Sequence, residues 1–256
     1  MRGFGPTLAV GATAALLSAA AVYAASGGDA ASGAAAVVPL KEAKLNIEHN
    51  ATDEDTGFQG FVDSEGWRRL DVRGPRGTVL TLQGRGSLAS LGLTELFFET
   101  VEPENAKVPI AEMLAKLPEG RYTIAGAAQE NGKSLGRTSG TALLTHDIPA
   151  GPKLISPADG ATVPVRGVVA RWQPVTKTIT GEPVQIVAYQ LIIEKDTPPH
   201  RHMIGKLGLS IYVPRTVTSI AVPDGFLEPG TNYVWEVLAI ERSGNQTLSS
   251  GSFRTR

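Results

Sequence analysis

The stretch at residues 227–237 constrains the fold more than any other part of the chain. Pro229 and Gly230 supply the geometry of a tight turn, and Tyr233, Trp235 and Val237 then follow at every second position. A period of two places these three side chains on one face of a strand. The sequence therefore predicts a turn that leads into a strand with one buried, partly aromatic face.

Composition extends this prediction to the whole chain. The 29 Gly and 17 Pro are spread along 256 residues, which favours many short strands joined by turns over a helical bundle. This length is sufficient for two domains, each with its own core. We therefore predict an all-β chain of two tandem β-sandwich domains, of which the first contains one short helix.

Charge and cysteine content exclude several function classes. The 24 basic and 25 acidic residues give a net charge of −1, which argues against nucleic acid because a duplex-binding protein needs an excess of Lys and Arg. The chain has no cysteine, so thiol catalysis and Cys-ligated metal sites are excluded. Its stability must come from packed cores instead of disulfides.

Residues 1–24 have the three parts of a secretory signal peptide. Arg2 provides the charge, residues 8–21 form an apolar run, and residues 22–24 end in a small residue, Ala24, as a cleavage site. The run of about 14 residues is shorter than the roughly 20 that a membrane-spanning helix needs, although an uncleaved anchor is the alternative. We predict export to the periplasm, the cell surface or the medium, with no membrane span after cleavage. Residues 25–43, which begin with an Ala/Gly/Ser-rich run, are predicted to be a flexible leader.

The first domain is predicted at residues 44–150. A hairpin is expected around the turn at residues 74–77, a further strand at residues 94–101 and a short helix at residues 108–117. Strands at residues 119–126 and 138–145 should flank the turn at Asn131 and Gly132. Pro149, Gly151 and Pro152 are expected to form a short, stiff hinge to the second domain.

The second domain, residues 151–256, carries about seven alternating segments, the number that a two-sheet sandwich needs. It resembles a fibronectin type III module in Trp172, in the strand at residues 189–191, in the turn and tyrosine at residues 227–233, and in the closing strand at residues 251–255. Such modules act as spacers and binding surfaces. The integrin-binding Arg-Gly-Asp tripeptide is absent, so integrin adhesion is not implied. The first domain is similar to immunoglobulin-like sandwiches in shape only.

A calcium site is the first candidate among the polar segments. Asp53, Asp55 and Asp63 lie in an acidic stretch with Gly57, and calcium prefers hard oxygen ligands on an irregular loop. The spacing differs from the EF-hand pattern, so a solvated acidic turn is the alternative.

Other candidate sites are weaker. His200 and His202 could share a zinc or copper ion or could decorate an exposed loop. Glu95 and Glu99 would lie roughly 13 Å apart on one strand face, farther than either glycosidase geometry allows. The Gly-x-Ser-x-Gly elbow and a phosphate-binding loop are both missing.

The functional prediction combines these observations. We predict no enzyme and no cofactor, but an exported protein-interaction, adhesion or scaffold module of the cell envelope. The alternative is a carbohydrate-binding accessory protein of a secreted hydrolase, in which an exposed aromatic stacks on sugar rings. Trp67, beside Arg68 and Arg69, is the tryptophan that this alternative would use.

Overall fold

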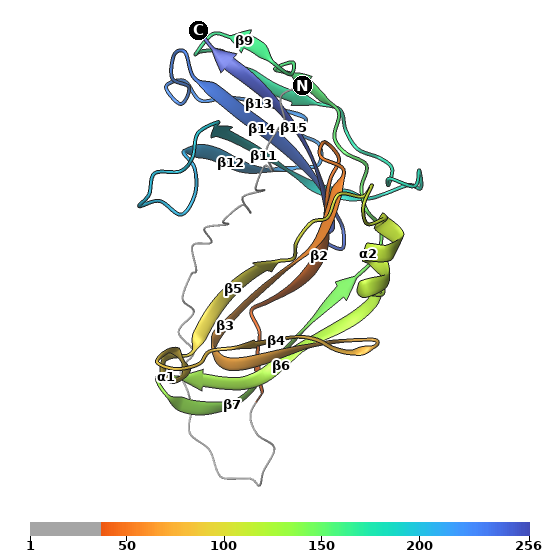
Figure 1. Ribbon diagram of the computed structural model, residues 1–256, viewed down its shortest axis with the longest axis vertical. Helices are drawn as coiled ribbons and strands as arrows, with labels where there is room; N and C mark the ends of the chain where they lie inside the picture. Colours follow the sequence, from red (N-terminus) through yellow and green to blue (C-terminus); the bar gives the residue numbers. More distant parts are fainter. Residues whose placement is uncertain (1–36) are drawn as a thin grey trace.

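The computed structural model describes residues 37–256, and this part of the chain is almost entirely β-structure (Figure 1). The predicted all-β class is confirmed. Two β-sandwich units follow one another along the chain, one ending at Leu144 and the next starting at Leu154. The predicted signal peptide and residues 25–36 of the predicted leader lie outside the described residues.

The first unit consists of β1 (Val37–Pro39), β2 (Glu42–Asn50), β3 (Asp55–Gly74), β4 (Gly77–Gln83), α1 (Leu88–Leu91), β5 (Leu93–Glu99), α2 (Ile110–Lys116), β6 (Gly120–Glu130) and β7 (Lys133–Leu144). The second consists of β8 (Leu154–Ser156), β9 (Ala161–Val163), β10 (Val169–Trp172), β11 (Ile186–Lys195), β12 (Gly208–Pro214), β13 (Ser219–Ala221), β14 (Asn232–Glu241) and β15 (Gln246–Thr255).

The long strand β3 organises the first unit because its two halves belong to different layers. Its first half pairs with β2 on one side and β5 on the other, whereas its second half pairs with β4 and β6. The register shifts near Trp67 on both sides of the strand, as expected where a strand bends. The core of the unit forms between the two halves and includes Ile47, Leu70 and Tyr122.

Several predicted elements of the first unit are confirmed. The turn at residues 74–77 joins β3 to β4, with Gly74 opposite Gly77. The predicted helix is α2, which buries Met113. A second short helix, α1, was not predicted because its four residues bury no side chain and so leave no apolar pattern.

The start of the first unit differs from the prediction. The predicted leader extends to residue 43, yet Val38 pairs with Thr138 in β1, and Glu42 pairs with Asp63 in β2. Leu40 packs against the core. These apolar and paired residues offset the entropy of ordering the segment, so the first unit already includes Val37.

The second unit is a sandwich of two mostly antiparallel sheets. One sheet has the order β13-β10-β8, and the facing strands have the order β15-β14-β11-β12, with β9 parallel to β15. The core between them contains Trp172 from β10, Tyr189 from β11 and Trp235 from β14. This arrangement is the one expected from the fibronectin type III resemblance.

The turn and tyrosine at residues 227–233, on which the fibronectin type III resemblance rests, form a tyrosine corner in the second unit. Tyr233 is buried, and its hydroxyl accepts a 2.9 Å hydrogen bond from the backbone N–H of Glu228. The first unit has a counterpart, in which the Tyr122 hydroxyl donates a 2.8 Å bond to the Pro118 carbonyl. Both tyrosines thus fasten a Pro- and Gly-containing turn to the strand that follows it.

Candidate functional site

The two units are joined by strand pairing as well as by the chain. β15 of the second unit runs parallel to β2 of the first, with Gln246 opposite Glu48 and Leu248 opposite Asn50. One sheet therefore continues from the first unit into the second at the place where β2 and β15 meet in Figure 1.

Asn245 occupies the centre of this junction and is 0% exposed. Its Oδ1 accepts a 2.9 Å hydrogen bond from the backbone N–H of Ile47. Its Nδ2 donates to the carbonyls of Thr145 and Asp147 at 3.0 and 3.2 Å. One amide side chain thus connects strand β2, the segment between the units and the turn that starts β15.

The predicted hinge is held on several sides. The Thr247 hydroxyl donates a 2.6 Å bond to the Pro149 carbonyl. A Cβ placed on Gly151 would lie 2.5 Å from the Cβ of Ala51, so only glycine allows this close approach. The segment therefore packs into the junction.

Three carboxylates gather on the first-unit side of the junction. Glu48 on β2, Glu99 at the end of β5 and Glu102 just beyond it each offer an oxygen, and these oxygens all lie within 4.8 Å of one another. We call this set the carboxylate cluster.

The strand register explains why the carboxylate cluster forms. Glu48 pairs with Gly57 on β3, and Glu99 pairs with Gln59 two residues further along, so both glutamates project from one face of the three strands. A Cβ on Gly57 would lie 2.6 Å from the Cγ of Glu102. The glycine therefore leaves the space that Glu102 occupies.

Burial and mutual repulsion disfavour the charged forms of these acids. Burial raises the pKa of Glu48 to about 7, against the lowering effect of the Gln246 hydrogen bond. Burial, followed by the charges of Glu48 and Glu99, raises the pKa of Glu102 to about 8. Burial and the nearby Asp53 raise the pKa of Asp55 to about 6.

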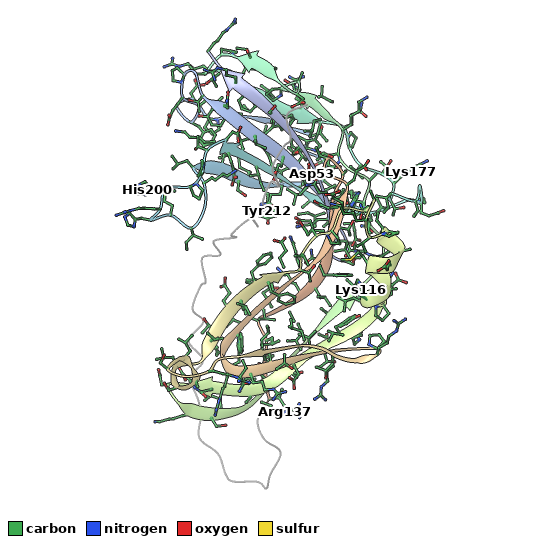
Figure 2. All side chains as sticks on the ribbon, viewed as in Figure 1. Asp53, Lys116, Arg137, Lys177, His200 and Tyr212 are labelled. Carbon is green, nitrogen blue, oxygen red and sulfur yellow. The ribbon has the colours of Figure 1, made fainter. Side chains whose placement is uncertain are left out.

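The structure separates the three predicted calcium ligands. Asp53 and Asp55 lie close together at the β2–β3 turn, where the Asn50 side chain donates a 2.9 Å bond to Asp53. Asp63 lies eight residues along β3 from Asp55, a separation of roughly 26 Å at about 3.3 Å per residue. Asp63 therefore cannot share an ion with the other two. Figure 2 shows Asp53 where the two units meet.

The remaining predicted residues do not form a site. His200 and His202 are exposed on a loop that extends from the second unit (Figure 2), and no third ligand joins them among the described residues. Trp67 is 0% exposed, so the prediction that this ring could reach sugar was wrong. The bend in β3 turns its indole into the core while Arg68 and Arg69 remain exposed.

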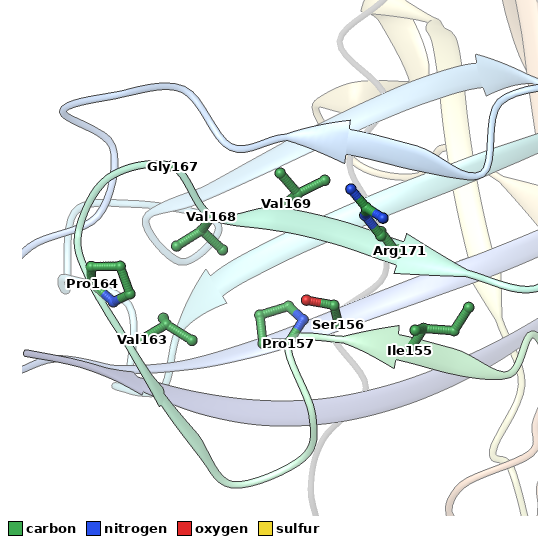
Figure 3. Close-up of a pocket in the computed structure, with 9 residues that line it drawn as sticks. All are labelled: Ile155, Ser156, Pro157, Val163, Pro164, Gly167, Val168, Val169 and Arg171. Carbon is green, nitrogen blue, oxygen red and sulfur yellow. The ribbon is translucent and has the colours of Figure 1, made fainter.

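One surface depression of the second unit lacks the groups for acid–base chemistry. It measures about 390 Å³ and lies beside β8 and β10 of the second unit (Figure 3). Its nine lining residues include no Asp, Glu or His, and Arg171 is the one charged side chain among them. Acyl transfer or glycoside cleavage would need a base or a carboxylate pair here.

Comparison with known proteins gives structural neighbours only. No protein-family model matches the chain, and no curated protein matches it. A two-domain fibronectin type III segment of chicken tenascin aligns with a TM-score of 0.31 and 12% identity, over 84% of this chain and 99% of that one. The FN1-FN3 domains of chicken CNTN1 align with a TM-score of 0.32 and 11% identity, over 86% of this chain and 64% of that one. A tetra-tandem repeat from the extending region of a large adhesion protein aligns with a TM-score of 0.29 and 13% identity, over 84% of this chain and 50% of that one.

These neighbours are fibronectin type III or adhesion-protein repeats, but the TM-scores near 0.3 describe a loose overlay. The fibronectin-like assignment of the second unit therefore depends on its own strand order and tyrosine corner. In the described residues, no helix is long and apolar enough to cross a membrane.

The sequence did not reveal the carboxylate cluster. Glu48 and Glu102 are 54 positions apart, and only the pairing of β2, β3 and β5 brings them together. Gly57, in the interior of strand β3, was the one local signal, because a glycine inside a strand often marks a close approach.

Proposed function

We propose that this chain is an exported, non-catalytic module that binds a protein partner in the cell envelope or outside the cell. The junction of the two units is the observation that supports the proposal most. A binding surface that spans two units loses less entropy on association when the units are already fixed in relation to each other. Asn245 and the β2–β15 pairing provide that fixation.

Export is supported by the signal-like segment at residues 1–24. N-terminal sequencing of the protein recovered from its native host should find a mature chain that starts at or near Ala25. Recovery of chains that start at Met1 from a membrane fraction would instead support an uncleaved anchor.

The binding proposal is tested by capture from the native host. The mature chain is immobilised, incubated with envelope and culture fractions, cross-linked and analysed by mass spectrometry. The expected result is a specific protein whose retention falls when soluble mature chain is added as competitor. Asn245→Ala should weaken that retention, whereas Asn232→Ala, a substitution of the same type at an exposed site, should not.

Two outcomes would contradict the proposal. One is that no protein is enriched over an unrelated β-sandwich bait while the chain binds an oligosaccharide array. The other is that the chain fractionates with the cytosol. Glycan binding would instead support the alternative function of a carbohydrate-binding accessory protein, with a sugar site that does not include the buried Trp67.

A further inference from the structure

We propose that the carboxylate cluster of Glu48, Glu99 and Glu102 binds one calcium ion at the junction of the two units. The inference concerns ion binding and is independent of whether a protein partner exists. It differs from the loop site predicted from the sequence in all three ligands.

The distances within the cluster suit calcium. Calcium–oxygen bonds are about 2.3–2.6 Å long, so two ligands of one ion are at most about 4.6–5.2 Å apart. The three cluster oxygens lie within 4.8 Å of one another and meet this limit. All three are carboxylate oxygens, the hard ligands that calcium prefers over nitrogen or sulfur.

The enclosure of the cluster is a second observation that points to a bound cation. Glu48 is only 6% exposed, although it is an acid. Glu102 Oε1 and Asp55 Oδ1 are buried, and no hydrogen-bond donor among the described residues reaches either atom. A buried carboxylate oxygen is costly unless a donor or a cation compensates it.

Side chains of the protein do not supply that cation. None of the ion pairs in the described part of the chain includes Glu48, Glu99 or Glu102. The charged groups that act on Glu48 and Glu102 are further acids, among them Asp55 and Glu236. Neutral side-chain amides donate hydrogen bonds to two of these acids instead. Gln246 donates to Glu48, and Gln59 donates to Glu99 at 2.7 Å.

The location gives the ion a structural role. Glu48 belongs to the strand that pairs with β15, whereas Glu99 and Glu102 belong to the end of β5 and the segment after it. A calcium ion would fasten this segment to the junction strand. Gly57 makes the arrangement possible because its missing Cβ leaves the space for Glu102.

The test measures calcium binding and thermal unfolding of the mature chain, with calcium chloride as the probe. Titration calorimetry of chelator-treated protein at pH 7.5 should show one site, with a dissociation constant of roughly 10⁻⁴–10⁻³ M, typical of extracellular modules. Ten millimolar calcium should raise the unfolding temperature of the first unit, chelator should reverse the shift, and equal magnesium should have a smaller effect.

Variants identify the ligands. Glu102→Gln and Glu99→Gln should each weaken calcium binding at least tenfold. Glu95→Gln on the same strand β5 and Asp53→Asn in the nearby turn should leave binding within twofold of the wild type, because neither residue belongs to the cluster. Using two cluster variants keeps the test decisive should one of them fold poorly.

Three outcomes would overturn the proposal. The wild type could show no heat of binding and no thermal shift at ten millimolar calcium. Both cluster variants could retain wild-type affinity. Asp53→Asn could abolish binding while Glu102→Gln retains it, which would place the ion in the β2–β3 turn instead.

Discussion

Replacing Asn245 with alanine tests the junction most directly. The substitution removes the acceptor of the Ile47 N–H and the donor to the carbonyls of Thr145 and Asp147. Asn245 is fully buried, so water does not replace these partners without rearrangement.

The magnitude follows from the groups left unpaired. A buried N–H without a partner costs about 1–3 kcal/mol, and the two carbonyls that lose their shared donor add about 1–2 kcal/mol. We therefore expect Asn245→Ala to lower the free energy of unfolding by about 2–5 kcal/mol, a large share of the roughly 5–15 kcal/mol of a typical domain. Asn232→Ala removes only an exposed bond to Arg254 and should change stability by less than about 0.5 kcal/mol.

Two measurements check this expectation. Urea unfolding should show a lower midpoint for Asn245→Ala than for Asn232→Ala. Amide hydrogen exchange should show faster exchange at Ile47, because its N–H loses its acceptor. If the two variants have equal midpoints and Ile47 keeps its protection, Asn245 does not hold the units together and the reasoning fails.

Further predictions concern the core, the linker and one partly buried acid. Tyr233→Phe should lower the free energy of unfolding by about 0.5–1.5 kcal/mol, or by about 1–3 kcal/mol if the Glu228 N–H stays unpaired. Tyr233→Ala should lower it by roughly 3–5 kcal/mol. Equal denaturant midpoints for both variants and the wild type would contradict the tyrosine corner. Gly151→Ala should destabilise the junction by about 1–3 kcal/mol through overpacking, while Gly205→Ala, with open space around it, should be nearly neutral in thermal unfolding. Burial raises the pKa of Glu236 from 4.5 to about 7, so its contribution to stability is full below pH 4.5 and is lost as the pH rises through 7. Glu236→Gln should therefore reduce the loss of stability between pH 5 and 8 by up to about 3 kcal/mol in urea titrations, and an unchanged pH dependence would contradict the burial effect.

The sequence was sufficient for the parts of the fold that local patterns encode. The alternation of Tyr233, Trp235 and Val237 placed these side chains in the core, and the Pro229-Gly230 turn located the tyrosine corner. The counterpart at Tyr122 could have been found in the same way, because residues 117–122 repeat the order Leu, Pro, Gly, Tyr.

The prediction failed where long-range pairing decides the outcome. Trp67 looked exposed beside Arg68 and Arg69, but the register shift in β3 turns its ring inward. The predicted calcium ligands were chosen by closeness along the chain, which cannot show that Glu48 and Glu99 share one face of three strands and that Glu102 lies beside them. Strand register is set by tertiary packing, so these contacts could not be read from local spacing.

The pairing of β2 with β15 also determines when the protein can finish folding. Gln246 and Glu48 are 198 positions apart. Their pairing therefore closes a long loop of chain. During synthesis the strands of the first unit, which end at Leu144, emerge before residue 246 does, and until then the outer edge of β2 has no partner there. An open strand edge invites pairing with other chains, and a charged side chain on that edge discourages it. Glu48 is the acid at this position, so we expect its charge to disfavour pairing of the unfinished edge with other chains.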